Sequence, residues 1–137
     1  MATASSAYML IFREATPERY ETIPAEERRR SLERWNAWLD ALATQGKLQH
    51  GHPLESSGRV VSAAGVAPAV DGPFAEAKEL VGGYILVTAS SLEEATAIAE
   101  QCPRLGEGLL VEVRPVAQAC SLARSLGMRT MREPIPT

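Results

Sequence analysis

The stretch LVGGYILVTASSLEEATAIA, residues 80–99, decides the fold. Its first nine residues are rich in apolar and β-branched side chains, which is typical of a strand, and Gly82 and Gly83 indicate a bulge or a close backbone approach. Ser91 and Glu94 follow with the spacing of a capping box, in which both side chains accept hydrogen bonds from unpaired amides at a helix start. The stretch therefore predicts a strand followed directly by a helix.

Further strands are predicted on both sides of this unit. Residues 109–116 alternate between apolar odd-numbered side chains and partly polar even-numbered ones, which is typical of a strand with one buried face. The continuous apolar run from Tyr8 to Phe12 favours a strand in the centre of a sheet. Leu48 to Glu55 predicts another strand, and Arg59 to Ser62 with Val66 to Val70 predicts a hairpin.

A long helix is predicted from Pro24 to Gly46. Proline and the two glutamates that follow it suit a first helical turn, and glycine suits a helix end. Four apolar side chains recur at three- and four-residue steps and predict one stripe packed against the core: Leu32, Trp35, Leu39 and Leu42.

The order of these elements is strand, helix, strand, hairpin, strand, helix, strand. This is the split βαβ arrangement of an α+β, ferredoxin-like fold with an inserted hairpin. Both helices then cover one face of the sheet, and the other face, with residues such as Tyr84 and Leu110, is open in a monomer. Because a large exposed apolar sheet normally finds a partner, we expect a homodimer.

Composition excludes several classes of function. The 137 residues, 45% of them hydrophobic and 23% charged, fit one globular domain. A net charge of -3 gives no field that attracts nucleic acid, so no direct nucleic-acid binding is expected. No apolar run reaches the ~18 residues that span a bilayer, and no signal peptide is visible. We therefore expect a cytoplasmic protein without a membrane partner, in which Cys102 and Cys120 are free thiols.

A motif between the hairpin and the strand from Leu80 resembles a known family. DGPFAEAKE at residues 71–79, followed by VGGY at residues 81–84, resembles the signature of the DGPF-motif proteins, a branch of the YCII-related family. The resemblance runs in order from residue 8 to residue 116 and includes GRVV at 58–61, SLEEA at 91–95 and VEVRP at 111–115. It implies the ferredoxin-like fold and pairing of two copies into a dimeric α+β barrel.

The resemblance also divides the chain and points to functions. It implies a YCII-related (DGPF) domain over residues 1–116, with residues 117–137 as a C-terminal extension that forms no separate domain. Some YCII-related relatives look like small lyases or dehydrochlorinases that use a His and Asp pair, with the histidine on the first helix. Here residues 24–46 contain no histidine. DGPF-type domains are often fused to, or encoded beside, sigma-type transcription factors, which implies an association with transcription.

Asp71 is the candidate catalytic residue. It precedes Gly72 and Pro73 in a predicted turn, where an aspartate side chain bonds to backbone two residues on. The alternative is a carboxylate held at a cleft beside the long helix, acting as a base or a ligand anchor. Both roles stay open, with the turn-capping role favoured.

The candidate ligand-binding residues are Trp35, Trp38, Arg59, Phe74 and Lys78. The two indoles either pack in the core or stack against a ligand. Arg59 or Lys78 would hold a substrate carboxylate, although a solvated surface also explains Lys78.

His50 and His52 are the only histidines, and their spacing places both side chains on one face of a strand. Such a pair can hold a metal, but Glu55 has the wrong parity to add a third ligand. We therefore predict no metal and no cofactor.

These observations favour a small-molecule pocket between the long helix and the sheet. One alternative is a cofactor-free lyase or hydrolase of small organic acids, with Asp71 as the base. Another is a protein-interaction module that serves a transcription factor.

Overall fold

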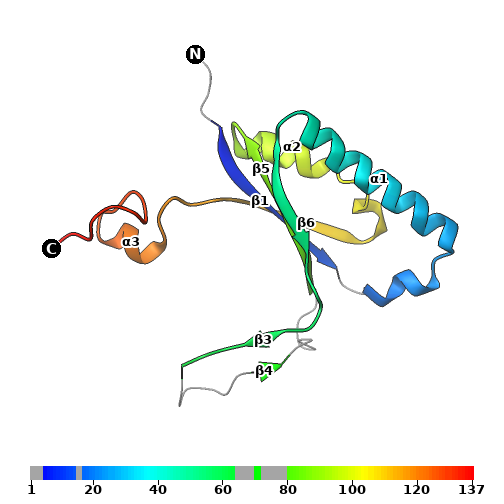
Figure 1. The fold of residues 1–137 in the computed structure, drawn as a ribbon, viewed down its shortest axis with the longest axis horizontal. Coiled ribbons are helices and arrows are strands. Elements are labelled where there is room, and N and C mark those ends of the chain that lie inside the picture. The colour runs from blue at the N-terminus through cyan, green and yellow to red at the C-terminus, as the bar shows by residue number, and fades with distance from the viewer. Residues whose placement is uncertain (1–4, 15–16, 64–69, 72–79) are drawn as a thin grey trace.

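The computed structural model describes residues 5–14, 17–63, 70–71 and 80–137 of the chain (Figure 1). Its elements, in chain order, are β1 (Ser6–Glu14), the 3-10 helix η1 (Pro17–Thr22), α1 (Ala25–Thr44), β2 (Leu48–Pro53), β3 (Arg59–Val60), β4 (Val70–Asp71), β5 (Leu80–Ala89), α2 (Leu92–Glu100), the 3-10 helix η2 (Leu105–Glu107), β6 (Leu109–Pro115) and α3 (Ser121–Ser125).

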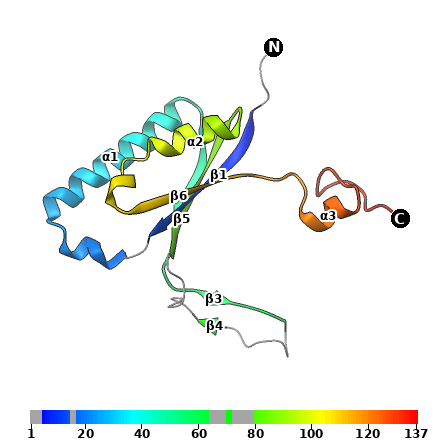
Figure 2. The ribbon, with the colours of Figure 1, turned by 180° about the vertical axis from the view of Figure 1, so that it is seen from behind.

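Four of the strands form one antiparallel sheet in the order β2-β5-β1-β6. The first strand therefore lies in the centre, as its continuous apolar sequence predicts, and the strand order confirms the ferredoxin-like α+β fold. Figures 1 and 2 show α1 and α2 on the same side of this sheet. The small pair β3 and β4 is separate and projects from the end of the sheet.

The core lies between the sheet and the two long helices. Leu10 of β1, Val87 of β5 and Ala95 of α2 are completely buried, and Leu109 of β6 is almost so. On β6 the odd-numbered residues face this core, whereas Leu110, which pairs with Arg13, is 51% exposed on the opposite face. The alternation predicted for this strand is confirmed, and one face of the sheet stays open to solvent.

The stripe predicted on α1 is buried only at its C-terminal end. Leu42 is buried, and Trp35 and Leu39 pack against the core as partly buried side chains. Leu32, in contrast, is 59% exposed. The prediction that Leu32 packs in the core is therefore wrong, because periodicity fixes the direction of a side chain but not how far the opposing sheet extends. α1 continues past the core, and the space beneath its N-terminal half is a pocket.

The capping box at α2 forms with one change of partner. The Ser91 hydroxyl accepts a hydrogen bond from the amide of Glu94 at 3.1 Å, as the spacing predicts. The carboxylate of Glu94 accepts from the amide of Ser90 at 2.8 Å, and from its hydroxyl, instead of from Ser91. These hydrogen bonds, together with the charge of Lys47, hold the pKa of Glu94 below its usual range.

The glycine pair in β5 forms the predicted bulge. Phe12 pairs with Gly83 and Arg13 with Val81, so Gly82 is the extra residue. Gly83 also allows a close approach of β2, because a Cβ there would lie 2.8 Å from the carbonyl oxygen of His52. The bulge and the close approach together determine the backbone path of β5 beside the pocket.

The predicted hairpin is present as a short ladder. Arg59 pairs with Asp71 and Val60 with Val70, so the described part of the second strand includes the last residue of the predicted segment Val66–Val70. The rest of that segment up to residue 69, and most of the DGPF motif, lie outside the described residues.

The C-terminal extension forms a small unit of its own. Ala119, Ala123 and Met128 make a separate apolar cluster, and Gly127 follows the end of α3 with a φ of 81°. Figures 1 and 2 show α3 away from the sheet and from the other helices.

Candidate functional site

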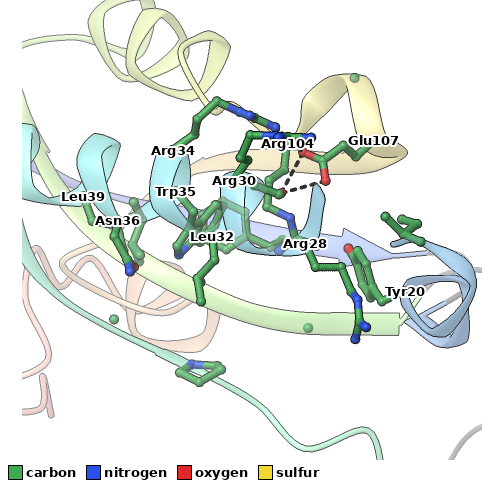
Figure 3. Close-up of a pocket in the computed structure, with 18 of the residues that line it drawn as sticks. Tyr20, Arg28, Arg30, Leu32, Arg34, Trp35, Asn36, Leu39, Arg104 and Glu107 are labelled. Atoms are coloured by element: carbon green, nitrogen blue, oxygen red, sulfur yellow. Dashed lines mark hydrogen bonds and ion pairs between the residues drawn. The ribbon is translucent and has the colours of Figure 1, made fainter. Parts of the chain in front are cut away.

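A pocket of about 1040 Å³ lies between α1 and the β2–β5 side of the sheet (Figure 3). The 3-10 helices η1 and η2 close one end of it through Tyr20 and Glu107. His52 and Tyr84, whose side chains by register belong to the open face of the sheet, also line it. The fold thus leaves space where α1 extends beyond the core.

The inner wall of the pocket is apolar and aromatic. Phe12 of β1 meets Trp35 of α1 edge-on, with ring centroids 4.9 Å apart. Trp35 in turn contacts the ring of Trp38 at 5.3 Å, also edge-on. Leu39 and Ile85 continue this wall. Such a surface binds flat apolar groups, because aromatic rings offer large contact areas at low entropic cost.

The rim of the pocket is strongly basic. Five of the described lining residues are arginines and two are glutamates, although the whole chain has a net charge of -3. The arginines come from three elements: Arg19 from η1, Arg28, Arg30 and Arg34 from α1, and Arg104 from the turn before η2. The charge of the pocket is therefore opposite in sign to that of the molecule.

Arg104 is the most firmly positioned of these cations. Its Nη2 donates to Glu14 Oε1 at 2.9 Å, and the hydroxyl of Tyr20 donates to the same oxygen at 2.6 Å. The guanidinium also lies over the ring of Tyr20 at 4.9 Å and over that of Trp35 at 5.5 Å. With its side chain 21% exposed, Arg104 is held between two rings and a carboxylate at the wall of the pocket.

A second polar contact joins η2 to α1. The hydroxyl of Ser31 donates to both carboxylate oxygens of Glu107, at 2.8 and 2.9 Å (Figure 3). Arg34 lies 3.8 Å from the same carboxylate. This contact fixes the distance between the two elements that bound the basic end.

The tryptophans predicted as ligand-binding residues differ in their placement. Trp35 lines the pocket, but Trp38 is not among the lining residues. Trp38 packs behind Trp35, and its Nε1 atom is buried without a hydrogen-bond acceptor in the described part of the chain.

Of the other predicted residues, only Arg59 has a described side chain, and the structure does not bring it to the pocket. Arg59 is exposed on β3 and is absent from the pocket lining. The backbone of Asp71 is paired in β4, but its side chain, like Phe74 and Lys78, lies outside the described residues.

Sequence reasoning missed most of the basic end. The run Arg28-Arg29-Arg30 predicts a solvated helix face, and both Arg29 and Arg30 do pair with Glu26, at 3.3 and 3.8 Å. Arg28 and Arg30 nevertheless line the pocket. The arginines of α1 would indicate a basic pocket only if it were known that this helix extends beyond the sheet. The sequence does not show that extension.

The two histidines lie on the same face of β2, as predicted, and their register with Leu86 and Tyr84 shows that this is the open face of the sheet. Their ring centroids are 6.3 Å apart, and Tyr84 lies beside both. Within the described ranges, no three residues among His, Cys, Asp and Glu gather as a metal site would require.

Both cysteines are free thiols in this structure. Burial raises the pKa of the Cys102 thiol, which makes that thiol a poor nucleophile. Cys120 is exposed at the start of α3, and its sulfur accepts a hydrogen bond from the amide of Ala123.

The sheet order, the helices on one face and the pocket under the first helix define an α+β protein of the ferredoxin-like type. Residues 7–119 match the model of the YCII-related domain, so the chain belongs to that family. The match ends before α3.

Comparison with solved structures finds three chains that match. The chain is similar to 5-chloro-2-hydroxyhydroquinone dehydrochlorinase (TftG) from Burkholderia phenoliruptrix AC1100, solved in complex with 2,5-dihydroxybenzoquinone. The identity is 20% and the TM-score 0.47, over 82% of this chain and 95% of that one. A search of curated proteins finds no match. Across the described ranges, none of the helices has the length and apolarity needed to cross a bilayer.

Proposed function

We propose that this YCII-related protein binds a small organic molecule in the pocket between α1 and the sheet. One observation carries the proposal: a space of about 1040 Å³ is lined by an aromatic wall on one side and by fixed polar groups on the other. This size and this mixture of apolar surface with a few convergent polar groups are typical of ligand sites.

The exposure of Leu32 supports the same proposal. An apolar side chain that is 59% exposed at the mouth of a pocket gains by contact with an apolar ligand. Trp35 adds a flat surface beneath it, and Arg104 is already positioned before any ligand arrives. A ligand therefore meets a largely preformed site, which lowers the entropic cost of binding.

The test uses N-phenylnaphthylamine, a neutral aromatic probe that fluoresces in apolar surroundings. We expect saturable binding to the wild type and a loss of about tenfold or more in affinity for Leu32→Asp, since a carboxylate in the pocket must be desolvated.

Leu122→Asp is the matched control, because Leu122 is also an exposed leucine but lies on α3. The control variant should bind like the wild type. If both variants bind the probe as tightly as the wild type does, the probe binds outside the pocket. That result would contradict the proposal.

Several finer predictions accompany this function. We propose that two copies pair through the open sheet face to form an α+β barrel, supported by exposed Leu110 and Val81 on that face. Membership of the DGPF branch rests on the motif at residues 71–79. Cytoplasmic location, association with a transcription factor and a lyase or hydrolase activity with Asp71 as the base stay predictions.

A further inference from the structure

We propose that the pocket selects organic anions that carry a flat apolar group, and that Arg28, Arg19 and Arg104 bind the anionic end. The inference rests on the proposed small-molecule site and adds the chemical class of its ligand. Carboxylates and sulfonates attached to a ring are the expected members of this class.

The ion pairs at the basic end show which arginines have a carboxylate partner among the described residues. Arg30 is paired with Glu26, Arg34 with Glu107 and Arg104 with Glu14. Arg19 and Arg28 have no ion-pair partner among the described residues, although both line the pocket.

The lining carboxylate Glu27 likewise has no ion-pair partner within those ranges. Two unpaired guanidinium groups against one unpaired carboxylate leave a positive balance, which an anionic ligand would neutralise.

The three proposed anion-binding groups converge from different parts of the chain. Arg104 lies over the ring of Tyr20, which places it beside η1. The guanidinium of Arg19 occupies the space that a side chain at Gly108 would need, which places it beside η2. Figure 3 shows the side chain of Arg28 running from α1 toward the end of the pocket where Tyr20 lies.

Arg104 provides a preorganised part of this site. Its hydrogen bond to Glu14 uses only Nη2, and within the described structure no other hydrogen bond engages the guanidinium. A guanidinium carries five N–H donors in a fixed plane, so the remaining donors can bind a carboxylate or sulfonate with little further ordering. Arg28 and Arg19 would add charge from flexible side chains.

The apolar part of the ligand has a surface next to these charges. Trp35 contacts both the guanidinium of Arg104 and the ring of Phe12. A ring bound against Trp35 therefore places an attached anionic group at the arginines. This adjacency is why we infer a ring-bearing anion and not a free inorganic ion.

The test compares two probes that share one ring system. Anilinonaphthalene sulfonate carries a sulfonate, whereas N-phenylnaphthylamine does not. Affinities for both are measured by fluorescence titration on the full-length wild type, on Arg28→Gln and on Arg29→Gln. Arg29 is the matched control because it is a neighbouring arginine on α1 that pairs with Glu26 and is absent from the pocket lining.

We expect the wild type to bind the sulfonate probe more tightly than the neutral probe, with an advantage that falls as salt is added. Arg28→Gln should lose about tenfold in affinity for the sulfonate probe, because charge-assisted hydrogen bonds are the strong ones, and change by less than about twofold for the neutral probe. Arg29→Gln should leave both affinities within about twofold.

Two outcomes overturn the inference alone. Equal wild-type affinity for the two probes, or equal losses in Arg28→Gln and Arg29→Gln, would show a pocket without selection for anions and leave the proposed function intact. Absence of binding by either probe would overturn the proposed function, and the inference with it.

Discussion

The cluster of Arg104, Glu14 and Tyr20 joins three elements through one carboxylate oxygen. Glu14 ends β1, Tyr20 lies in η1 and Arg104 precedes η2. Because Glu14 is only 18% exposed, its charge depends on these two donors for compensation. The same contacts hold the guanidinium at the pocket wall, so the cluster contributes both to stability and to the site.

Replacing Arg104 by Gln should lower the free energy of unfolding by about 1–3 kcal/mol, because the half-buried Glu14 carboxylate loses a charged donor. Urea unfolding of Arg104→Gln and of the control Arg114→Gln, an exposed arginine on β6, measures the difference. Similar stabilities of the two variants would mean that the pair with Glu14 contributes little.

This cluster also marks a limit of prediction from sequence. Ser91 and Glu94 form their cap within one turn of helix, so their spacing alone predicts it. Glu14 and Arg104 are 90 residues apart, and no local pattern indicates that they meet. The aromatic half of the pocket was therefore partly predictable through Trp35, whereas the basic half follows only from tertiary structure.

At the scale of elements, β2 and β5 approach closely because glycine is present at their contact. A Cβ at Gly51 would lie 2.6 Å from both the Cγ2 atom of Ile85 and the carbonyl oxygen of Tyr84. We expect Gly51→Ala to destabilise the protein by about 1–3 kcal/mol, since the backbone must shift. Thermal unfolding checks this against Gly58→Ala, where a Cβ meets nothing within 4 Å. A variant as stable as the control would contradict the tight pairing.

The hydrogen bonds of Glu94 at the start of α2 predict that the stability of the folded protein depends on pH. Because Ser90 holds the pKa of Glu94 below its usual range, the ionised carboxylate stabilises the folded state at neutral pH. That stabilisation is lost as the pH falls through the lowered pKa. Melting temperatures of wild type and Glu94→Gln should therefore differ at pH 7, and the difference should shrink as the pH falls toward about 3, below the ordinary glutamate range. A difference that stays constant down to that pH would contradict the assignment.

The elements themselves were predicted with mixed success. Strands and capped helices follow from local pattern, and the order of strands in the sheet follows from the split βαβ arrangement of the elements. The extent of burial does not, because Leu32 has the periodicity of a core residue and yet is exposed. The pocket lies where α1 extends beyond the core, and its position depends on how α1 crosses the sheet.

At the scale of the whole molecule, the open sheet face predicts assembly. Leu110 and Val81 are exposed on this face beside Tyr84. Sedimentation should give about twice the monomer mass of 14.8 kDa at micromolar concentration. Leu110→Asp should shift the protein toward monomer, whereas Leu92→Asp, which changes an exposed leucine on α2, should not. A wild type that is monomeric at these concentrations would contradict the barrel.

The central claim, that the pocket under α1 binds a small molecule, is tested most directly by NMR of the indole N–H groups. The chain has two tryptophans, and Trp35→Phe assigns their signals. On titration with anilinonaphthalene sulfonate, the Trp35 signal should shift saturably and by more than the Trp38 signal, because Trp35 lines the pocket and Trp38 packs behind it. Binding that leaves the Trp35 signal unmoved would contradict the claim.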